Sequence, residues 1–199
     1  RRNRRPAEIH GGLQVHEKKL EQAHLCLGLK GISVEHKDRY AAALLNAVLG
    51  GNVSSRLFQE IREKRGLAYS IYSCLSAYSD GGMWSVYAGT RPLEAPKVID
   101  LVSKEIARLC TKGIRRDELA RAKNQMKGSV MLGLESTSSR MGKLAKDELH
   151  HGRRVSLDEV MAGIDRVNEA QLIGLSRELF DKRRLSVAAL GPVSRRSLA

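Results

Sequence analysis

The chain has 199 residues, with 35 Lys and Arg against 22 Asp and Glu and a formal net charge of +13 at pH 7. With 42% hydrophobic and 29% charged residues, and no apolar run near the roughly 18 residues that a membrane span needs, the composition excludes disordered and membrane-spanning classes. Nearly half of the net charge lies in the first or last five residues, at Arg1, Arg2, Arg4, Arg5, Arg195 and Arg196. The charge alone therefore does not establish nucleic acid as the partner.

The cysteines and the start of the chain indicate the cellular compartment of the protein. Cys26, Cys74 and Cys110 are an odd number and lie far apart, which argues against a disulfide framework and for a reducing compartment. The chain does not begin with Met, and its basic start runs into Pro6 rather than into the apolar stretch of a signal peptide. We expect a piece of a longer protein, located in the bacterial cytoplasm.

The first half of the chain predicts two helices among three strands. Residues 1–22 are polar, which indicates a linker or an edge segment. Apolar residues alternate over 24–29, which predicts a strand. Apolar residues recur at helical spacing over 36–49, and Ser54 or Ser55 can cap a second helix that Gly66 ends. Two strands follow over 67–77 and 83–89, with a turn at 79–82 between them.

The second half is mostly helical. Helices are predicted over 93–109, 115–134 and 138–150, then after Ser156 and after Asn168, with a last strand over 185–190. This order indicates an α+β fold, an antiparallel-rich mixed sheet with helices packed on one face. We expect a linker or edge segment over 1–19, a single domain over 20–193 and a basic tail over 194–199.

The chain carries no complete motif for metal, phosphate or nucleophilic chemistry. None of its six histidines completes His-Glu-x-x-His or His-x-x-Glu-His, so no residue of this chain is predicted to bind a metal. The glycines at 50 and 51 lack the Gly-Lys-Ser/Thr ending of a phosphate-binding loop and indicate a helix end. Nucleic-acid binding through the basic ends ranks last, because stacking aromatics are missing there.

One long motif is specific. The stretch LGGNVSSRLFQEIREKRGLAYS over residues 49–70 resembles the signature of the pitrilysin family of zinc metallopeptidases, in the branch of mitochondrial processing peptidase and its bacterial relatives. The resemblance continues in EQAHL (21–25), YSD (78–80), YAGT (87–90), ELARAK (118–123), LESTSSRM (134–141) and GP (191–192). It covers about residues 20–192.

The resemblance implies a half of a two-domain clamshell. In this family the N-terminal domain holds zinc through His-x-x-Glu-His, and the second domain has the same fold without metal ligands, as here. This chain would then be the second, non-catalytic half of a zinc metalloendopeptidase, which closes the chamber over an extended peptide. Its partner would be the N-terminal metal-binding domain, and a dimer is a further arrangement to consider. We expect the chain alone to bind no stoichiometric zinc and to cleave no peptide.

The family's second domain also supplies an arginine and a tyrosine that face the zinc. By motif these are Arg62, which would bind the peptide carbonyls, and Tyr69, which would bind the substrate and support the transition state. Arg56 and Arg65 are competitors for the anchoring role, and Arg140 matches the family without an assigned role. The alternative is a parent without zinc in either half that acts as a regulatory or scaffolding subunit; the sequence upstream of this chain would distinguish the two.

Overall fold

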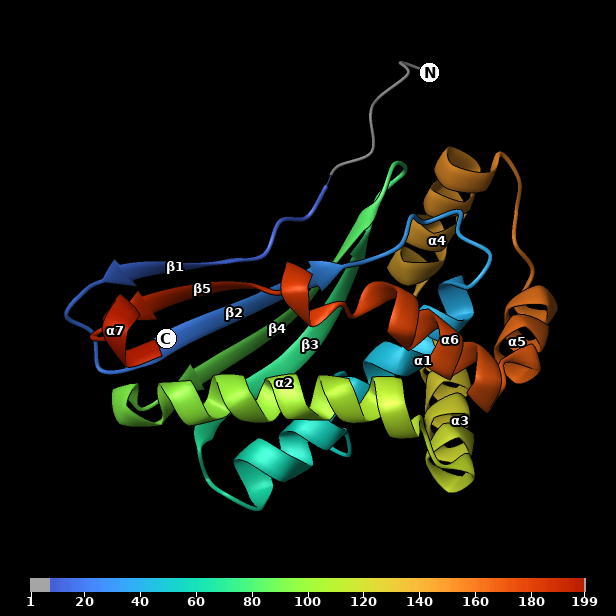
Figure 1. Ribbon diagram of the computed structural model, residues 1–199. Helices are drawn as coiled ribbons and strands as arrows, with labels where there is room; N and C mark the ends of the chain where they lie inside the picture. The colour runs from blue at the N-terminus through green and yellow to red at the C-terminus, as the bar shows by residue number, and fades with distance from the viewer. Residues whose placement is uncertain (1–7, 199) are drawn as a thin grey trace.

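The computed structural model describes residues 8–198, which form one five-stranded sheet and a set of helices (Figure 1). The strands lie in the order β1-β5-β2-β4-β3. β1 and β5 are parallel, and the other neighbouring pairs are antiparallel. The strands are β1 (Gly12–Glu17), β2 (Ala23–Lys30), β3 (Ala68–Ala77), β4 (Gly82–Thr90) and β5 (Ser186–Gly191). The expected antiparallel-rich mixed sheet is confirmed.

The helices gather on one side of this sheet, and α2 crosses its face in Figure 1. They are α1 (Arg39–Leu49), α2 (Ala95–Lys112), α3 (Arg116–Gly133), α4 (Thr137–His151), α5 (Leu157–Arg166), α6 (Glu169–Leu179) and the short α7 (Arg195–Leu198). Three further turns of helix are the π-helix η1 (Phe58–Glu63) and the 3₁₀ segments η2 (Pro92–Glu94) and η3 (Lys182–Arg184). The predicted helical order is thus confirmed.

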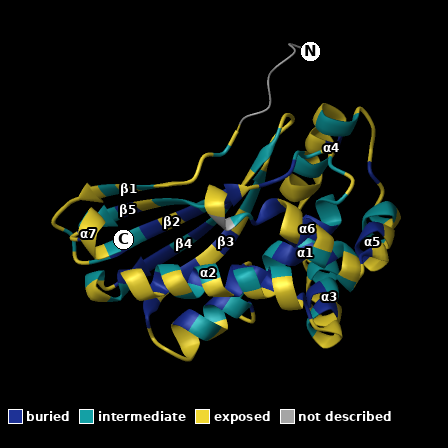
Figure 2. Cartoon of the chain, viewed as in Figure 1, coloured by how far each residue is buried: buried dark blue, intermediate teal, exposed yellow. Residues whose placement is uncertain are grey.

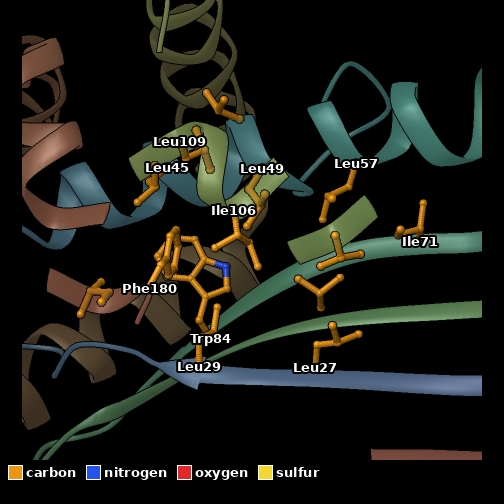
Figure 3. Packing of buried hydrophobic residues seen from close by; sticks show 14 of the residues in the cluster. Leu27, Leu29, Leu45, Leu49, Leu57, Ile71, Trp84, Ile106, Leu109 and Phe180 are labelled. Atoms are coloured by element: carbon orange, nitrogen blue, oxygen red, sulfur yellow. The ribbon is translucent and has the colours of Figure 1, made fainter. Parts of the chain in front are cut away.

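Alternation along the strands places the core under the helices. In β2, Leu25 and Leu27 are buried, whereas Cys26 and Lys30 are exposed, because successive side chains point to opposite faces. Buried residues of β2, β3 and β4 meet those of α1 and α2 in one cluster. At one end the Trp84 ring stands edge-on to Phe180, with the ring centroids 4.9 Å apart (Figure 3). The alternate residues of β2, among them Cys26 and Lys30, lie on the sheet face away from the helices.

One local expectation, the serine cap, differs from the structure. Neither Ser54 nor Ser55 caps a helix through its side chain; the Ser54 N–H instead bonds to Asn52 Oδ1 at 2.8 Å, and Ser55 Oγ is buried without a hydrogen-bond partner among the described residues. Within the segment expected to be linker or edge, β1 forms an edge strand of the sheet. The caps at Ser156 and Asn168 are confirmed by bonds from the backbone N–H groups of Glu159 and Gln171.

The β3 edge of the sheet is covered by other segments over only part of its length. On β3, the Ser73 N–H bonds outward to Gly50 O at 2.9 Å, and Tyr78 O accepts from the Val34 N–H at 2.9 Å. These bonds cover the middle and the end of the β3 edge, whereas no such bond among residues 8–198 reaches its first residues, which include Tyr69. The beginning of β3 is therefore the open part of that edge.

Candidate functional site

The η1–β3 corner, residues 58–69, brings the two predicted site residues onto one tight turn. The π-helix is marked by the Lys64 N–H, which donates to Gln59 O five residues back at 3.0 Å. The chain then reverses, with the Gly66 N–H on Arg62 O at 3.0 Å and the Leu67 N–H on Ile61 O at 2.9 Å. Gly66 has φ +58°, a conformation that glycine adopts without a steric penalty. The predicted turn between helix and strand is confirmed.

Arg62 lies in the last turn of η1 with its side chain exposed. Its guanidinium stacks over the Phe58 ring, 5.0 Å from the ring centroid. None of the ion pairs found within the described residues includes Arg62. The charge is thus oriented by an aromatic ring and remains available to an acceptor from outside.

Arg56 has the opposite surroundings. Its Nε lies 2.8 Å from Glu118 Oε1, and its Nη2 lies 2.7 Å from Glu118 Oε2 and 2.9 Å from Gly113 O. The two side chains are only 17% and 18% exposed. This bidentate pair joins the start of the η1 segment to α3, so Arg56 serves the fold.

Arg65 is also held within the chain. Its Nη1 bonds to both the backbone oxygen and the Oε2 of Glu60, each at 2.6 Å, and Lys64 binds the same carboxylate. Hydrogen bonds from Lys64 and Arg65 lower the pKa of Glu60. Of the three arginines considered for the anchoring role, Arg56 and Arg65 are engaged with carboxylates.

Tyr69 lies beside an irregularity in the β3–β4 pairing, between Ala68 and Ser70, and its side chain is 59% exposed. Such a bulge redirects a side chain and is common next to functional sites. The buried Thr90 hydroxyl donates to Leu67 O, which ties the start of β3 to β4. The tyrosine hydroxyl is therefore presented on a fixed backbone.

Glu118, the partner of Arg56, is a largely shielded carboxylate. Burial on its own would raise the pKa of Glu118, but the hydrogen bonds and the charge of Arg56 outweigh it and hold the pKa below the ordinary value. Glu118 is therefore ionised at neutral pH and paired. Sequence reasoning missed this partner because 62 residues separate it from Arg56.

A second feature lies on the sheet face without helices. A hollow of about 820 Å³ is lined by residues of β1, β5, β2 and β4, including His24, Cys26 and Tyr87, and by Arg195 of α7. His24 Nδ1 lies 2.8 Å from Tyr87 Oη, and the Tyr72 ring packs 5.2 Å from the Tyr87 ring, centroid to centroid. Sequence reasoning did not single out these residues, although the alternation of β2 places His24 and Cys26 on one face.

Metal ligands do not assemble in the described part of the chain. Residues 8–198 contain no group of three His, Cys, Asp or Glu side chains that could hold a metal ion. The residues present thus do not fit a zinc site.

Comparison with known proteins then identifies the family. Residues 1–126 match the model of the peptidase M16 inactive domain. This chain belongs to that family. It is 46% identical over 173 residues to an uncharacterized zinc protease of Bacillus subtilis, covering 87% of this chain and 42% of the relative. It is 40% identical over 193 residues to one of Streptomyces coelicolor, covering 97% and 42%.

Solved structures agree. A crystal structure of a peptidase M16 inactive domain from Pseudomonas fluorescens superposes with a TM-score of 0.88 at 26% identity, over 96% of this chain and 46% of that one. The chain therefore spans less than half the length of these relatives. Within residues 8–198, no helix has the length and apolarity to cross a membrane.

Proposed function

We propose that this M16 inactive domain is the second, non-catalytic half of a zinc metalloendopeptidase. It would close the peptide chamber and contribute Arg62 and Tyr69 to substrate binding. The family match and the relatives named zinc proteases support the general assignment. The zinc would belong to the N-terminal metal-binding domain, because the described residues here do not form a metal site.

The observation that carries the proposal is the contrast among three arginines of one motif. Arg56 and Arg65 are bonded to carboxylates of their own chain, whereas Arg62 is exposed and contacts Phe58. An arginine without an internal acceptor, set on a rigid turn, suits the carbonyl oxygens of an extended peptide. In this role Arg62 orients the peptide backbone.

Tyr69 would act at the same peptide. Its exposed hydroxyl can donate a hydrogen bond to the scissile carbonyl oxygen as negative charge develops there. The open first residues of the β3 edge lie beside it, where an extended peptide could pair with backbone groups. Both contacts would be made by this chain, while the bond-breaking chemistry would take place in the other domain.

The test is Arg62→Ala in the complete parent protein, with Arg65→Ala as the matched control. Loss of one charged hydrogen bond to substrate, worth about 1.5–3 kcal/mol, predicts a fall in kcat/KM of roughly ten- to a hundredfold, with no change in the melting temperature. Arg65→Ala is expected to keep full activity. An Arg62→Ala protein as active as the unmodified parent contradicts the site assignment, and a parent without peptidase activity favours the regulatory alternative.

A further inference from the structure

A second hollow, of about 620 Å³, lies between η1, the end of α2 and the start of α3, and we call it the α2–α3 hollow. Figure 2 shows exposed residues along α2 and α3, the two helices that meet there. The volume is within the range of about 300–1,000 Å³ that is usual for small-molecule sites. The lining includes six cationic side chains, which are Arg56, Lys64, Arg108, Lys112, Arg115 and Arg121.

Positive charge exceeds negative charge in this hollow. Of the described residues, three that line it are carboxylates, namely Glu60, Glu105 and Glu118, so the lining has an excess of three positive charges. Two charged residues touch the lining from outside, because Asp117 pairs with two of its arginines and Arg65 pairs with Glu60. Their charges are opposite, so the excess stays the same. A concave surface with an excess of one sign concentrates the electric field, and this hollow therefore attracts anions.

Two cations of α2 have donors that the chain does not use. Arg108 and Lys112 lie four residues apart, so their side chains leave the same face of the helix. No ion pair within residues 8–198 includes Lys112, which is exposed. Arg108 binds Glu105 through Nη1 at 2.7 Å, and its other guanidinium nitrogens make no hydrogen bond within that part of the chain. These donors are available to an anion in the hollow.

Other bonds hold the lining in place. The Arg56 guanidinium bonds to Glu118 and to Gly113 O, which joins the η1 segment to the end of α2 and the start of α3. The Arg115 N–H donates to Glu118 Oε2 at 3.3 Å and fixes the first turn of α3. A site whose walls are already positioned loses less conformational entropy when a ligand binds. The hollow is therefore formed before any ligand arrives.

The lining also indicates the chemistry of the ligand. No aromatic side chain is among the described residues that line the hollow, so a nucleic-acid base finds no ring to stack on. Side chains on one side of an extended acidic peptide are roughly 7 Å apart, since each residue advances the chain by about 3.3 Å. A di- or triphosphate instead gathers several negative charges in one compact group, and Arg and Lys both bind phosphate oxygens. A compact phosphate group therefore matches the excess charge best.

We propose that the α2–α3 hollow is a binding site for a di- or triphosphate group, with Arg108 and Lys112 as its principal donors. The ligand is either an inorganic polyphosphate or the phosphate end of a small phosphorylated molecule, because the two share this chemistry. The inference goes beyond the proposed peptidase function, which uses neither of these residues. It can therefore fail while Arg62→Ala behaves as expected, and the reverse also holds.

Calorimetric titration with inorganic tripolyphosphate tests the site. The 199-residue chain, which buries a hydrophobic core of its own, is titrated without divalent cations. We expect one ion to bind per chain, with an affinity that falls as salt is added. No binding at millimolar concentration would overturn the proposal. A nucleoside triphosphate is the second ligand, and equal affinity is expected because the lining offers no ring to the base. Tighter binding of the nucleoside triphosphate would contradict recognition of the phosphate group alone.

A matched pair of variants localises the binding. Lys112→Ala removes one charged hydrogen bond and is expected to weaken tripolyphosphate binding by roughly tenfold, and Lys112→Glu is expected to weaken it further. Lys97→Glu is the control, because Lys97 is exposed near the other end of α2, lies outside the lining and changes the net charge equally. Equal weakening by the two Glu variants would reduce the effect to net charge and overturn the site. Unchanged binding in a folded Lys112→Ala chain would also contradict it.

Competition distinguishes a compact group from an extended polyanion. A glutamate-rich peptide and a single-stranded oligonucleotide are each added to the complex with tripolyphosphate, and we expect neither to displace it at an equal concentration of charge. Displacement by the peptide would overturn the proposal in favour of an acidic protein segment. Displacement by the oligonucleotide would overturn it in favour of nucleic acid.

Discussion

Two arginines six positions apart in one motif have opposite surroundings. The Arg56–Glu118 joint is largely shielded from solvent and ties the η1 segment to α3 through a bidentate pair. The Arg62–Tyr69 corner is exposed, with the arginine on Phe58 and the tyrosine at a strand irregularity. An arginine therefore stabilises the fold where the chain supplies a carboxylate partner, and it remains available to a ligand where the chain supplies no such partner.

The largest expected effect tests the functional side of this comparison. Tyr69→Phe in the complete parent removes only the hydroxyl, and loss of one donor to a developing oxyanion predicts a fall in kcat of about 10²–10³-fold. Because the side chain is 59% exposed, the melting temperature should not change. Tyr78→Phe is the control, since Tyr78 is equally exposed and follows the other end of β3. Equal kcat values for the two variants would remove Tyr69 from the site.

The structural side is tested by Arg56→Ala. This change leaves the Glu118 carboxylate in a mostly shielded place without its partner, which predicts a loss of about 2–3 kcal/mol in the free energy of unfolding. Arg65→Ala, which breaks an exposed pair with Glu60, is expected to cost less than about 1 kcal/mol. Urea denaturation measures both. Equal losses of unfolding free energy in the two variants would show that the greater burial of the Arg56–Glu118 pair does not add to stability.

The smallest effect concerns pH. The pKa of Glu118 is lowered in the folded state, so its pairing stabilises the protein above the pKa of the unfolded carboxyl, about 4.3, and this stability is lost as the pH falls through the folded value. The difference in unfolding free energy between the unmodified chain and Glu118→Gln should therefore shrink between pH 6 and pH 3. Other carboxylates titrate in both proteins and cancel. If the difference in unfolding free energy stays constant with pH, the charge of the Glu118 carboxylate does not contribute to stability.

Much of the fold follows from local patterns. The alternation of β2 predicts which of its side chains face the helices, and Asn168 and Ser156 mark the starts of helices through bonds to nearby backbone groups. The turn at Gly66 is likewise local, which is why the positions of Arg62 and Tyr69 on either side of it could be predicted. The roles of these two residues remain proposals taken from the family resemblance.

Other features depend on residues far apart in the chain. The cluster of His24, Tyr72 and Tyr87 joins three strands that only the sheet register brings together. Local sequence preference gives no information about this cluster, because the pairing of the strands brings its members together.

The sequence by itself determined the order of the elements after β1, the antiparallel-rich sheet and the family, because periodicity and a long specific motif are properties of the chain read in one dimension. Only the tertiary structure decided which arginine is free, since the partner of Arg56 comes from α3, and which side of α4 faces outward, since Asp147 is held by Val155. Both depend on contacts whose free energy appears only once the elements are packed together.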